Sequence, residues 1–170
     1  RPFQFADFDA YAEYHKRSDV YRFLYSSPPS AEALEAQFSK SLSTAFEKDG
    51  DTLRLAVVRD ADSALVGEVL LKIASVSALQ AEIGYIFNPA FSGQGYATEA
   101  VRAMITLGFK ALGYHRIFAR LDALNHGSIG VVERLGMRKE AHLIENDRFD
   151  GLWGDEFIYA VLNREWASTS

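Results

Sequence analysis

Ile83-Gly-Tyr-Ile-Phe-Asn-Pro-Ala-Phe-Ser-Gly-Gln-Gly-Tyr-Ala-Thr-Glu99 is the stretch around which the predicted fold is organised. Residues 83–87 are rich in β-branched and aromatic side chains, which predicts a buried strand. Asn88-Pro89 ends this strand, because proline lacks an amide donor and fixes its own φ. Residues 92–95 then form a glycine-rich turn that leads into a helix, which Gly113 is placed to end. The apolar face expected for this helix comprises Val101, Met104, Ile105, Gly108 and Leu112.

The glycine turn is a candidate anion site. A turn that opens a helix brings unpaired backbone N–H groups and the positive end of the helix dipole to one place, which favours phosphate. The two glycines alone are equally compatible with an ordinary strand–turn–helix connection. The Gly-Lys-Ser/Thr motif of nucleotide triphosphate sites and the full dinucleotide fingerprint are both absent from the sequence.

A second group of polar residues, Asn125-His-Gly-Ser128, leads into Val131-Val-Glu-Arg-Leu-Gly-Met137. Asn125 and Ser128 lie at a predicted helix start, where capping explains both residues. Gly136 is equally well explained as a helix stop. Taken alone, this motif is therefore better explained by helix capping than by a catalytic or binding role.

Together, the motifs resemble those of the GNAT N-acetyltransferase superfamily. Residues 82–100 resemble its acetyl-coenzyme A motif, most closely that of the ribosomal-protein alanine N-acetyltransferase branch. Residues 125–137 resemble the second motif, Asn-x-x-Ser followed by Glu-x-Leu-Gly-Phe, with Met137 in place of the aromatic residue. The tail Asp155-x-x-x-Tyr159-x-x-Leu162-x-x-Glu165-Trp166 resembles the close of this branch. Ser92 departs from the usual Arg or Gln. The resemblance covers nearly the whole chain.

The resemblance implies acetyl-CoA as a co-substrate and identifies the residues that contact it. The turn amides would hold the pyrophosphate, Asn125 would contact the pantetheine arm, and Ser128 would lie near the sulfur. No metal site is expected, because the His, Asp and Glu residues show no ligand spacing. The residues expected to bind the co-substrate are Ile86, Phe87, Asn88, Ser92, Gly93, Gln94, Gly95, Tyr96, Ala97, Thr98, Asn125 and Ser128.

Acetyl transfer from a thioester requires a neutral amine and a protonated leaving thiolate. The position of the tyrosine acid of many family members is Val132 here, so Ser128 is the candidate acid, either as a proton donor or as a hydrogen-bond donor only. Glu82, at the start of the strand facing the coenzyme, is the first candidate base, and Glu68 on the neighbouring strand is the second. For each carboxylate, a place on the surface without catalytic role is the alternative.

Composition limits the classes of protein that fit. A chain of 170 residues with 48% hydrophobic content suits a single domain over residues 1–170. The lack of cysteine excludes disulfides, thiolate metal sites and a cysteine nucleophile. A net charge of −5 argues against nucleic-acid binding and favours the approach of a cationic amine.

Without a signal peptide or a membrane-length apolar run, we expect a cytoplasmic protein with no membrane partner. Numbering begins inside an apparent strand, which suggests that a short leader is missing.

Periodicity predicts an α/β (α+β) fold, and the resemblance implies a GNAT-like mixed, mostly antiparallel sheet of about seven strands flanked by about four helices. The expected strands are Arg1–Phe5, Thr52–Arg59, Val66–Ser75, Leu79–Asn88, Arg116–Leu121, Met137–Ile144 and Trp153–Leu162. Four helices are expected. The first follows the cap Asp7 and ends near Lys16, and the second runs from the cap Ser30 to Glu47. The third follows the glycine turn, and the fourth spans Gly127–Leu135.

The resulting hypothesis is an acetyl-CoA-dependent N-acetyltransferase that works by direct attack in a ternary complex. The acceptor is a primary amine, either a protein N-terminal α-amine or a small molecule such as a polyamine or aminoglycoside. The alternative is a coenzyme A-binding regulatory module without turnover; a scaffold would not require the glycine turn. Specificity is expected in the Val20–Ser30 and Asn146–Asp155 loops, and a homodimer is possible within this family. In the family, the first two helices and the loop between them form one wall of the acceptor groove. The aromatic residues that could line this wall, or could instead belong to the core, are Tyr21, Phe23, Tyr25 and Phe38.

Overall fold

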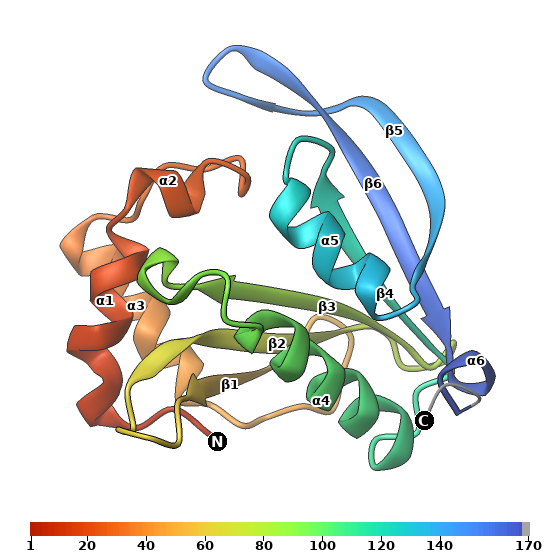
Figure 1. Cartoon of the computed structure of the whole chain (residues 1–170), viewed down its shortest axis with the longest axis horizontal. Helices are drawn as coiled ribbons and strands as arrows, with labels where there is room; N and C mark the ends of the chain where they lie inside the picture. Colours follow the sequence, from red (N-terminus) through yellow and green to blue (C-terminus); the bar gives the residue numbers. More distant parts are fainter. Residues whose placement is uncertain (168–170) are drawn as a thin grey trace.

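The computed structural model describes residues 1–167, in which a mixed sheet carries helices on both faces (Figure 1). Six strands lie in the order β1-β2-β3-β4-β6-β5, and only β3 and β4 run parallel. The strands are β1 (Thr52–Val58), β2 (Leu65–Ser75), β3 (Gln80–Phe87), β4 (Arg116–Asp122), β5 (Arg138–Phe149) and β6 (Leu152–Leu162). The helices are α1 (Phe8–His15), α2 (Ser18–Tyr21), α3 (Ala31–Ser41), α4 (Tyr96–Lys110), α5 (His126–Arg134) and α6 (Asn163–Ala167), with short 3-10 turns η1 (Phe5–Asp7) and η2 (Pro89–Phe91). This arrangement confirms the expected mixed, mostly antiparallel fold.

The sheet divides into two arms where β3 and β4 diverge. Their parallel pairing covers only residues 80–82 of β3 and 116–118 of β4. Beyond this point β3 continues along β2, whereas β4 continues along β6 (Figure 1). We call the opening between the two arms the splay. Its walls carry the predicted site.

Helix α4 packs against one face of the sheet and supplies much of the core. Strand alternation directs Val69, Leu71 and Ile73 of β2 to this face. Gly108 permits close approach, because an added Cβ would lie 2.7 Å from Cδ1 of Ile117. The buried residues of α4 include the predicted Val101, Met104, Ile105 and Gly108. Leu112 lies beyond the helix and is 39% exposed, so its expected place on the apolar face was wrong.

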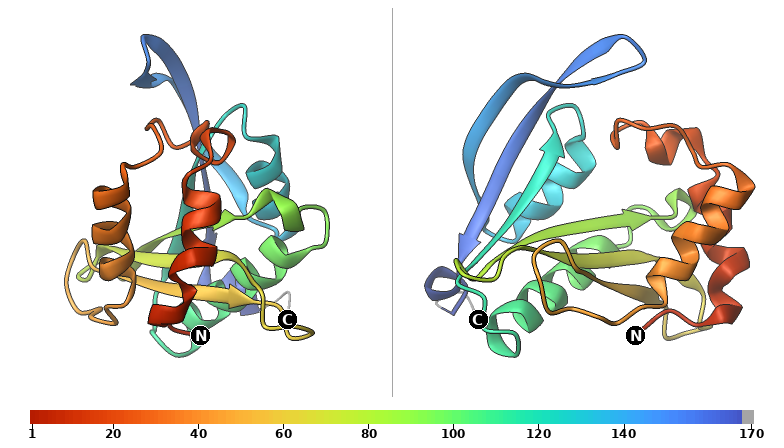
Figure 2. Two further views of the ribbon diagram at one scale, coloured as in Figure 1. Left: turned by 90° about the vertical axis from the view of Figure 1, so that its left-hand side faces the viewer. Right: turned by 180° about the vertical axis from the view of Figure 1, so that it is seen from behind.

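Helices α1 and α3 cover the opposite face at the β1–β2 side (Figure 2). A second apolar cluster forms there around Tyr11, Tyr14 and Phe38. Within residues 1–167, no helix has the length and apolar character needed to cross a membrane.

The N-terminal strand expected at Arg1–Phe5 does not form, and the described sheet therefore has six strands. Only an isolated bridge joins Pro2 to Leu55. The carboxylate of Asp7 accepts hydrogen bonds from the Gln4 amide at 2.7 Å and from the Arg1 guanidinium at 2.8 Å. These contacts turn the chain into η1. Asp7 precedes α1 as expected, but its side chain makes no capping hydrogen bond to that helix.

The second predicted helix begins where expected and ends earlier. The Ser30 hydroxyl accepts a hydrogen bond from the Ala33 amide, which confirms the N-cap. Helix α3 ends at Ser41, six residues before the expected Glu47. The Ser43 hydroxyl accepts from the Ala45 amide just beyond it, and such local side-chain contacts compete with helical hydrogen bonds. Helices α2 and α6 were not predicted.

The last two strands are longer than predicted and form a hairpin that projects from the body (Figures 1 and 2). The prediction of a loop over Asn146–Asp155 is wrong, because β5 continues to Phe149 and β6 begins at Leu152, which leaves a turn of two residues. Asp150 and Gly151 have φ of 50° and 80°, as a type I′ hairpin turn requires. The register shifts between Leu143 and Asp147, so this arm contains a bulge.

Candidate active site

A cavity of about 650 Å³ lies at the splay and joins both predicted motifs. Its lining comes from the end of β3, η2, the glycine turn, the first turn of α4, one face of α5, and the chain around α2. All of the predicted co-substrate residues except Asn88 and Gln94 line it. These are Ile86, Phe87, Ser92, Gly93, Gly95, Tyr96, Ala97, Thr98, Asn125 and Ser128.

The glycine turn has the geometry of an anion cradle. Gly93 and Gly95 have φ of 76° and 86°, and Gly95 is the N-cap of the 15-residue α4. A Cβ built on either glycine would meet no protein atom within 4 Å. The turn is therefore open on this side, and the first amides of α4 carry the positive end of its dipole. These features fit the pyrophosphate that the resemblance implies.

Asn88 and Gln94 have local structural partners instead. Asn88 is buried, and its side-chain oxygen accepts from the Ala90 amide at 3.0 Å, which caps η2. Gln94 is exposed, and its side-chain oxygen accepts from the Tyr96 hydroxyl at 3.3 Å. The sequence motif places both residues beside the cavity without directing their side chains into it.

Arg134 lines the cavity and was missed by the sequence analysis. Its Nε and Nη2 atoms lie 3.4 Å from the hydroxyl oxygen of Thr98, so its charge stands beside the glycine turn. Ser128, Val131 and Arg134 recur every three residues and share one face of α5. That spacing was the available signal.

Ser128 is held in place through its backbone. Its amide donates to the side-chain oxygen of Asn125 at 3.1 Å, which confirms the helix cap. Its carbonyl oxygen accepts from the Tyr85 hydroxyl at 3.0 Å, across the splay. Burial raises the pKa of Tyr85 to about 12, so this hydroxyl remains a donor at neutral pH. The Ser128 side chain is thereby placed at the cavity from two sides.

Glu82 occupies the last position at which β3 and β4 pair, opposite Phe118. It is half-buried and lies on the sheet face opposite α4, outside the cavity lining. On the same face, Arg120 donates to Glu156 at 2.8 Å. The hydrogen bond to Glu156 raises the pKa of Arg120, and the charges of Glu82 and Asp147 raise it further. Glu82 therefore stands near an acidic region that contains one arginine.

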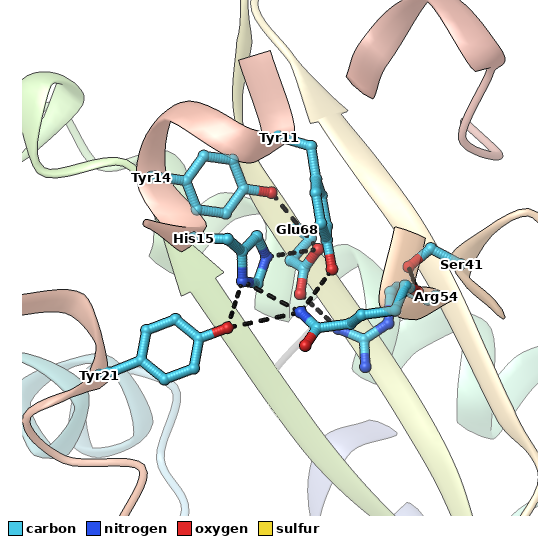
Figure 3. Close-up of polar contacts among 8 residues, drawn as sticks. Tyr11, Tyr14, His15, Tyr21, Ser41, Arg54 and Glu68 are labelled. Atoms are coloured by element: carbon cyan, nitrogen blue, oxygen red, sulfur yellow. Dashed lines mark hydrogen bonds and ion pairs between the residues drawn. The ribbon is translucent and has the colours of Figure 1, made fainter. Parts of the chain in front are cut away.

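Glu68 is the centre of a buried polar cluster (Figure 3). Its carboxylate pairs with Arg54, accepts from the Tyr14 hydroxyl at 3.3 Å, and lies 3.5 Å from Nε2 of His15. His15 in turn contacts the Tyr21 hydroxyl through Nδ1 at 2.8 Å. Burial, with a further contribution from the Glu68 charge, raises the pKa of Tyr14. The structure thus surrounds the second candidate base with protein groups.

The chain around α2 forms one wall of the cavity, on the side where the acceptor is expected. Asp19, Val20, Phe23 and Leu24 line the cavity, and Phe23 was among the aromatic residues expected there. Tyr21 and Phe38 are buried, which agrees with the alternative that they belong to the core. We call residues 17–25 the α2 segment.

Sequence comparison finds a family and close relatives. Residues 1–138 match the family described as "Acetyltransferase (GNAT) domain". The uncharacterized N-acetyltransferase YnaD of Bacillus subtilis (strain 168) is 32% identical over 166 residues, which cover 98% of this chain and 94% of that protein. The putative ribosomal N-acetyltransferase YdaF of the same organism is 32% identical over 105 residues, covering 62% of this chain and 57% of that protein.

Solved structures share the fold over nearly the whole chain. An acetyltransferase (GNAT family) from Bacillus anthracis has a TM-score of 0.87 at 31% identity, covering 97% of this chain and 94% of that one. Spermidine N-acetyltransferase from Vibrio cholerae, in complex with CoA and spermine, has a TM-score of 0.85 at 21% identity, covering 98% and 96%. The second similarity concerns the fold alone.

Proposed function

Because the chain belongs to the GNAT acetyltransferase family and is an N-acetyltransferase, we propose that it transfers the acetyl group of acetyl-CoA directly to a primary amine held in the same complex. The observation that carries this proposal is the single cavity that connects the glycine turn to Ser128. One compartment can thus hold the phosphate end of the donor and the reacting thioester.

The donor end of the cavity is suited to a phosphorylated ligand. We propose that the amides after Gly95 bind the pyrophosphate and that Arg134 adds a positive charge beside it. The family commonly has Arg or Gln at the position of Ser92, and serine is too short to make the same phosphate contact. We propose that Arg134 of α5 replaces that contact. The side-chain oxygen of Asn125 is occupied by the Ser128 amide, which leaves its NH₂ group to donate to the pantetheine arm.

The reaction forms a bond between the amine nitrogen and the thioester carbonyl carbon and breaks the bond between that carbon and sulfur. The amine loses one proton, and the leaving thiolate gains one. We propose that the Ser128 hydroxyl donates to the sulfur, because the usual acid position is occupied by Val132, whose side chain has no proton to donate. We propose Glu82 as the base, acting through a water molecule, since it lies at the vertex of the splay rather than on the cavity lining.

The acceptor is proposed to be a cationic primary amine. Glu82, Asp147 and Glu156 surround Arg120 on the sheet face opposite α4, so carboxylates outnumber cations in this group. Carboxylates attract an ammonium ion before it loses its proton. Polyamines, aminoglycosides and protein N-termini all satisfy this requirement. The sequence relatives named as a spermidine N(1)-acetyltransferase and a putative ribosomal N-acetyltransferase make polyamines and N-terminal peptides the first candidates.

An acetyl-CoA turnover screen tests this proposal directly. Free thiol release would be measured with polyamines, aminoglycosides and N-terminal peptides at equal concentration, with the acetylated amine identified by mass spectrometry. We expect turnover with at least one cationic amine and none with the same compound after all of its primary amines have been acetylated. A protein that binds coenzyme A but releases no thiol with any amine would instead be the regulatory module, and the proposed transfer would be rejected.

A further inference from the structure

The α2 segment is attached to the rest of the protein at its middle and at its last residue. At Tyr21, the hydroxyl contacts His15 of α1, which joins the segment to the β1-β2-β3 arm (Figure 3). At Tyr25, the hydroxyl donates to the backbone carbonyl of Asp155 in β6 at 3.4 Å. The second contact crosses the splay, because β6 belongs to the other arm.

The backbone of Tyr25 adopts an unusual conformation at this contact. Its φ is 49°, in the left-handed region that bulky side chains rarely adopt. Such conformations persist only where surrounding contacts enforce them, and they cluster at functional sites. The neighbouring Leu24 and Phe23 line the cavity.

The Tyr25 ring packs against Gly154 of β6. A Cβ built on Gly154 would lie 2.6 Å from Cε1 and 2.9 Å from Cζ of Tyr25. Any larger residue at position 154 would therefore displace the ring. Burial, followed by interaction with Asp122, raises the pKa of Tyr25, so its hydroxyl stays a donor through the neutral range.

We propose that Tyr25 is a positioning residue for the acceptor amine, because it ties the acceptor wall of the α2 segment to β6 across the splay. The wall residues Val20, Phe23 and Leu24 are then held at a fixed separation from the arm that carries Ser128. A displacement of about 1 Å between reacting groups can cost on the order of 100-fold in rate. The glycine turn lies elsewhere on the cavity, so donor binding does not depend on this contact. This inference rests on the proposed function.

The experiment is a double-substitution cycle read by acceptor kinetics. With the best amine from the screen, Tyr25→Ala should lower kcat/KM for that amine by at least about tenfold, which corresponds to ~1.4 kcal/mol. Gly154→Ala should produce a loss in the same parameter and add little in the Tyr25→Ala background, because both act through one contact. Coenzyme A affinity, measured by calorimetry, should stay within about twofold of the original in every variant.

Two comparisons separate positioning from general damage. Tyr25→Phe keeps the ring against Gly154 but removes the hydrogen bond to Asp155, so it should restore part of the kcat/KM lost in Tyr25→Ala. Ile144→Ala removes a 74% exposed side chain from β5 of the same hairpin, outside residues 146–155, and should leave acceptor kinetics unchanged. Acceptor kinetics unaltered by Tyr25→Ala, or additive losses in the double variant, would overturn the role of Tyr25 alone. A wild-type protein without amine turnover would overturn both this inference and the proposed function.

Discussion

The Tyr85 hydroxyl on β3 donates a 3.0 Å hydrogen bond to the carbonyl oxygen of Ser128 on α5 and so joins the two walls of the cavity. Tyr85→Phe removes this bond while keeping the ring. We expect kcat to fall, because Ser128 loses one of its two backbone restraints, and the free energy of unfolding to fall by about 1 kcal/mol. Steady-state kinetics and urea unfolding measure the two effects. An unchanged kcat would show that the Asn125 cap alone positions Ser128.

Tyr85 should also make the stability of the protein depend on pH in the alkaline range. Burial raises the pKa of Tyr85 to about 12 in the folded protein, above a value of about 10 in the unfolded chain. The folded state therefore keeps this proton longer. Its contribution to stability is complete below about pH 10 and is lost as the pH rises towards 12. Unfolding free energies measured across this window should fall less steeply for Tyr85→Phe than for the unaltered protein.

Gly95→Val tests the anion cradle. Valine disfavours the left-handed φ of 86°, and its side chain would fill the open space beside the turn. Coenzyme A affinity should fall by at least about tenfold, or ~1.4 kcal/mol. Gly50→Val is the matched control, because Gly50 has φ of 90° and open space around its Cβ position but lies away from the cavity. Equal affinity of the folded Gly95→Val variant and the control would reject this turn as the pyrophosphate site.

The sequence was most informative where one local pattern determines the structure. Strand alternation in residues 66–75, the break at Asn88-Pro89 and the glycines before Tyr96 each act within a few residues, and the structure places all of them as expected. The hairpin turn at Asp150-Gly151 was also readable, since Asp-Gly is typical of type I′ turns. It was missed because the preceding residues 145–148 are polar and resemble a loop.

Contacts between distant segments were not accessible from patterns. Glu68 was interpreted as a possible surface carboxylate, yet its burial depends on Arg54 from the neighbouring strand β1 and on Tyr14 and His15 from α1. Likewise, the contact of Tyr25 with Gly154 joins residues 129 positions apart in the chain. Neither partner carries a local signal for the other.

Glu68→Gln should destabilise the protein. The substitution removes the charge that pairs with Arg54 inside a fully buried site, and breaking such a pair costs roughly 3–5 kcal/mol. Because Arg54 keeps some exposure to water, we expect a loss near the lower end of that range. Urea unfolding measures it. Asp62→Asn, which removes the partner of Arg59 in an exposed pair, should leave the unfolding midpoint nearly unchanged. Equal stability of the two variants would contradict a structural role for Glu68.

Ser128→Ala separates catalysis from coenzyme binding. The hydrogen bonds that join Ser128 to Tyr85 and Asn125 use its backbone, so alanine preserves them and removes only the hydroxyl. If the hydroxyl assists the leaving thiolate, kcat should fall more than KM for acetyl-CoA rises. Positioned proton transfer is worth ~10²–10⁴-fold, and a hydrogen-bond donor should lie near the bottom of that range. A change confined to KM would make Ser128 a coenzyme contact.

Glu82→Gln tests the base. Glutamine keeps the shape of the side chain and the strand pairing opposite Phe118, but it cannot accept the proton of the acceptor ammonium. We expect the loss of kcat/KM to be largest below neutral pH, where the neutral amine is scarce. Raising the pH should recover part of the activity, because solvent then deprotonates the acceptor without help. Coenzyme A affinity should not change, since Glu82 lies outside the cavity lining. A pH–rate profile identical to that of the unaltered enzyme would clear Glu82 of this role. The same profile would then be measured for Glu68→Gln. In the unaltered protein, the Glu68 carboxylate can reach an amine only by giving up its contacts with Arg54 and Tyr14.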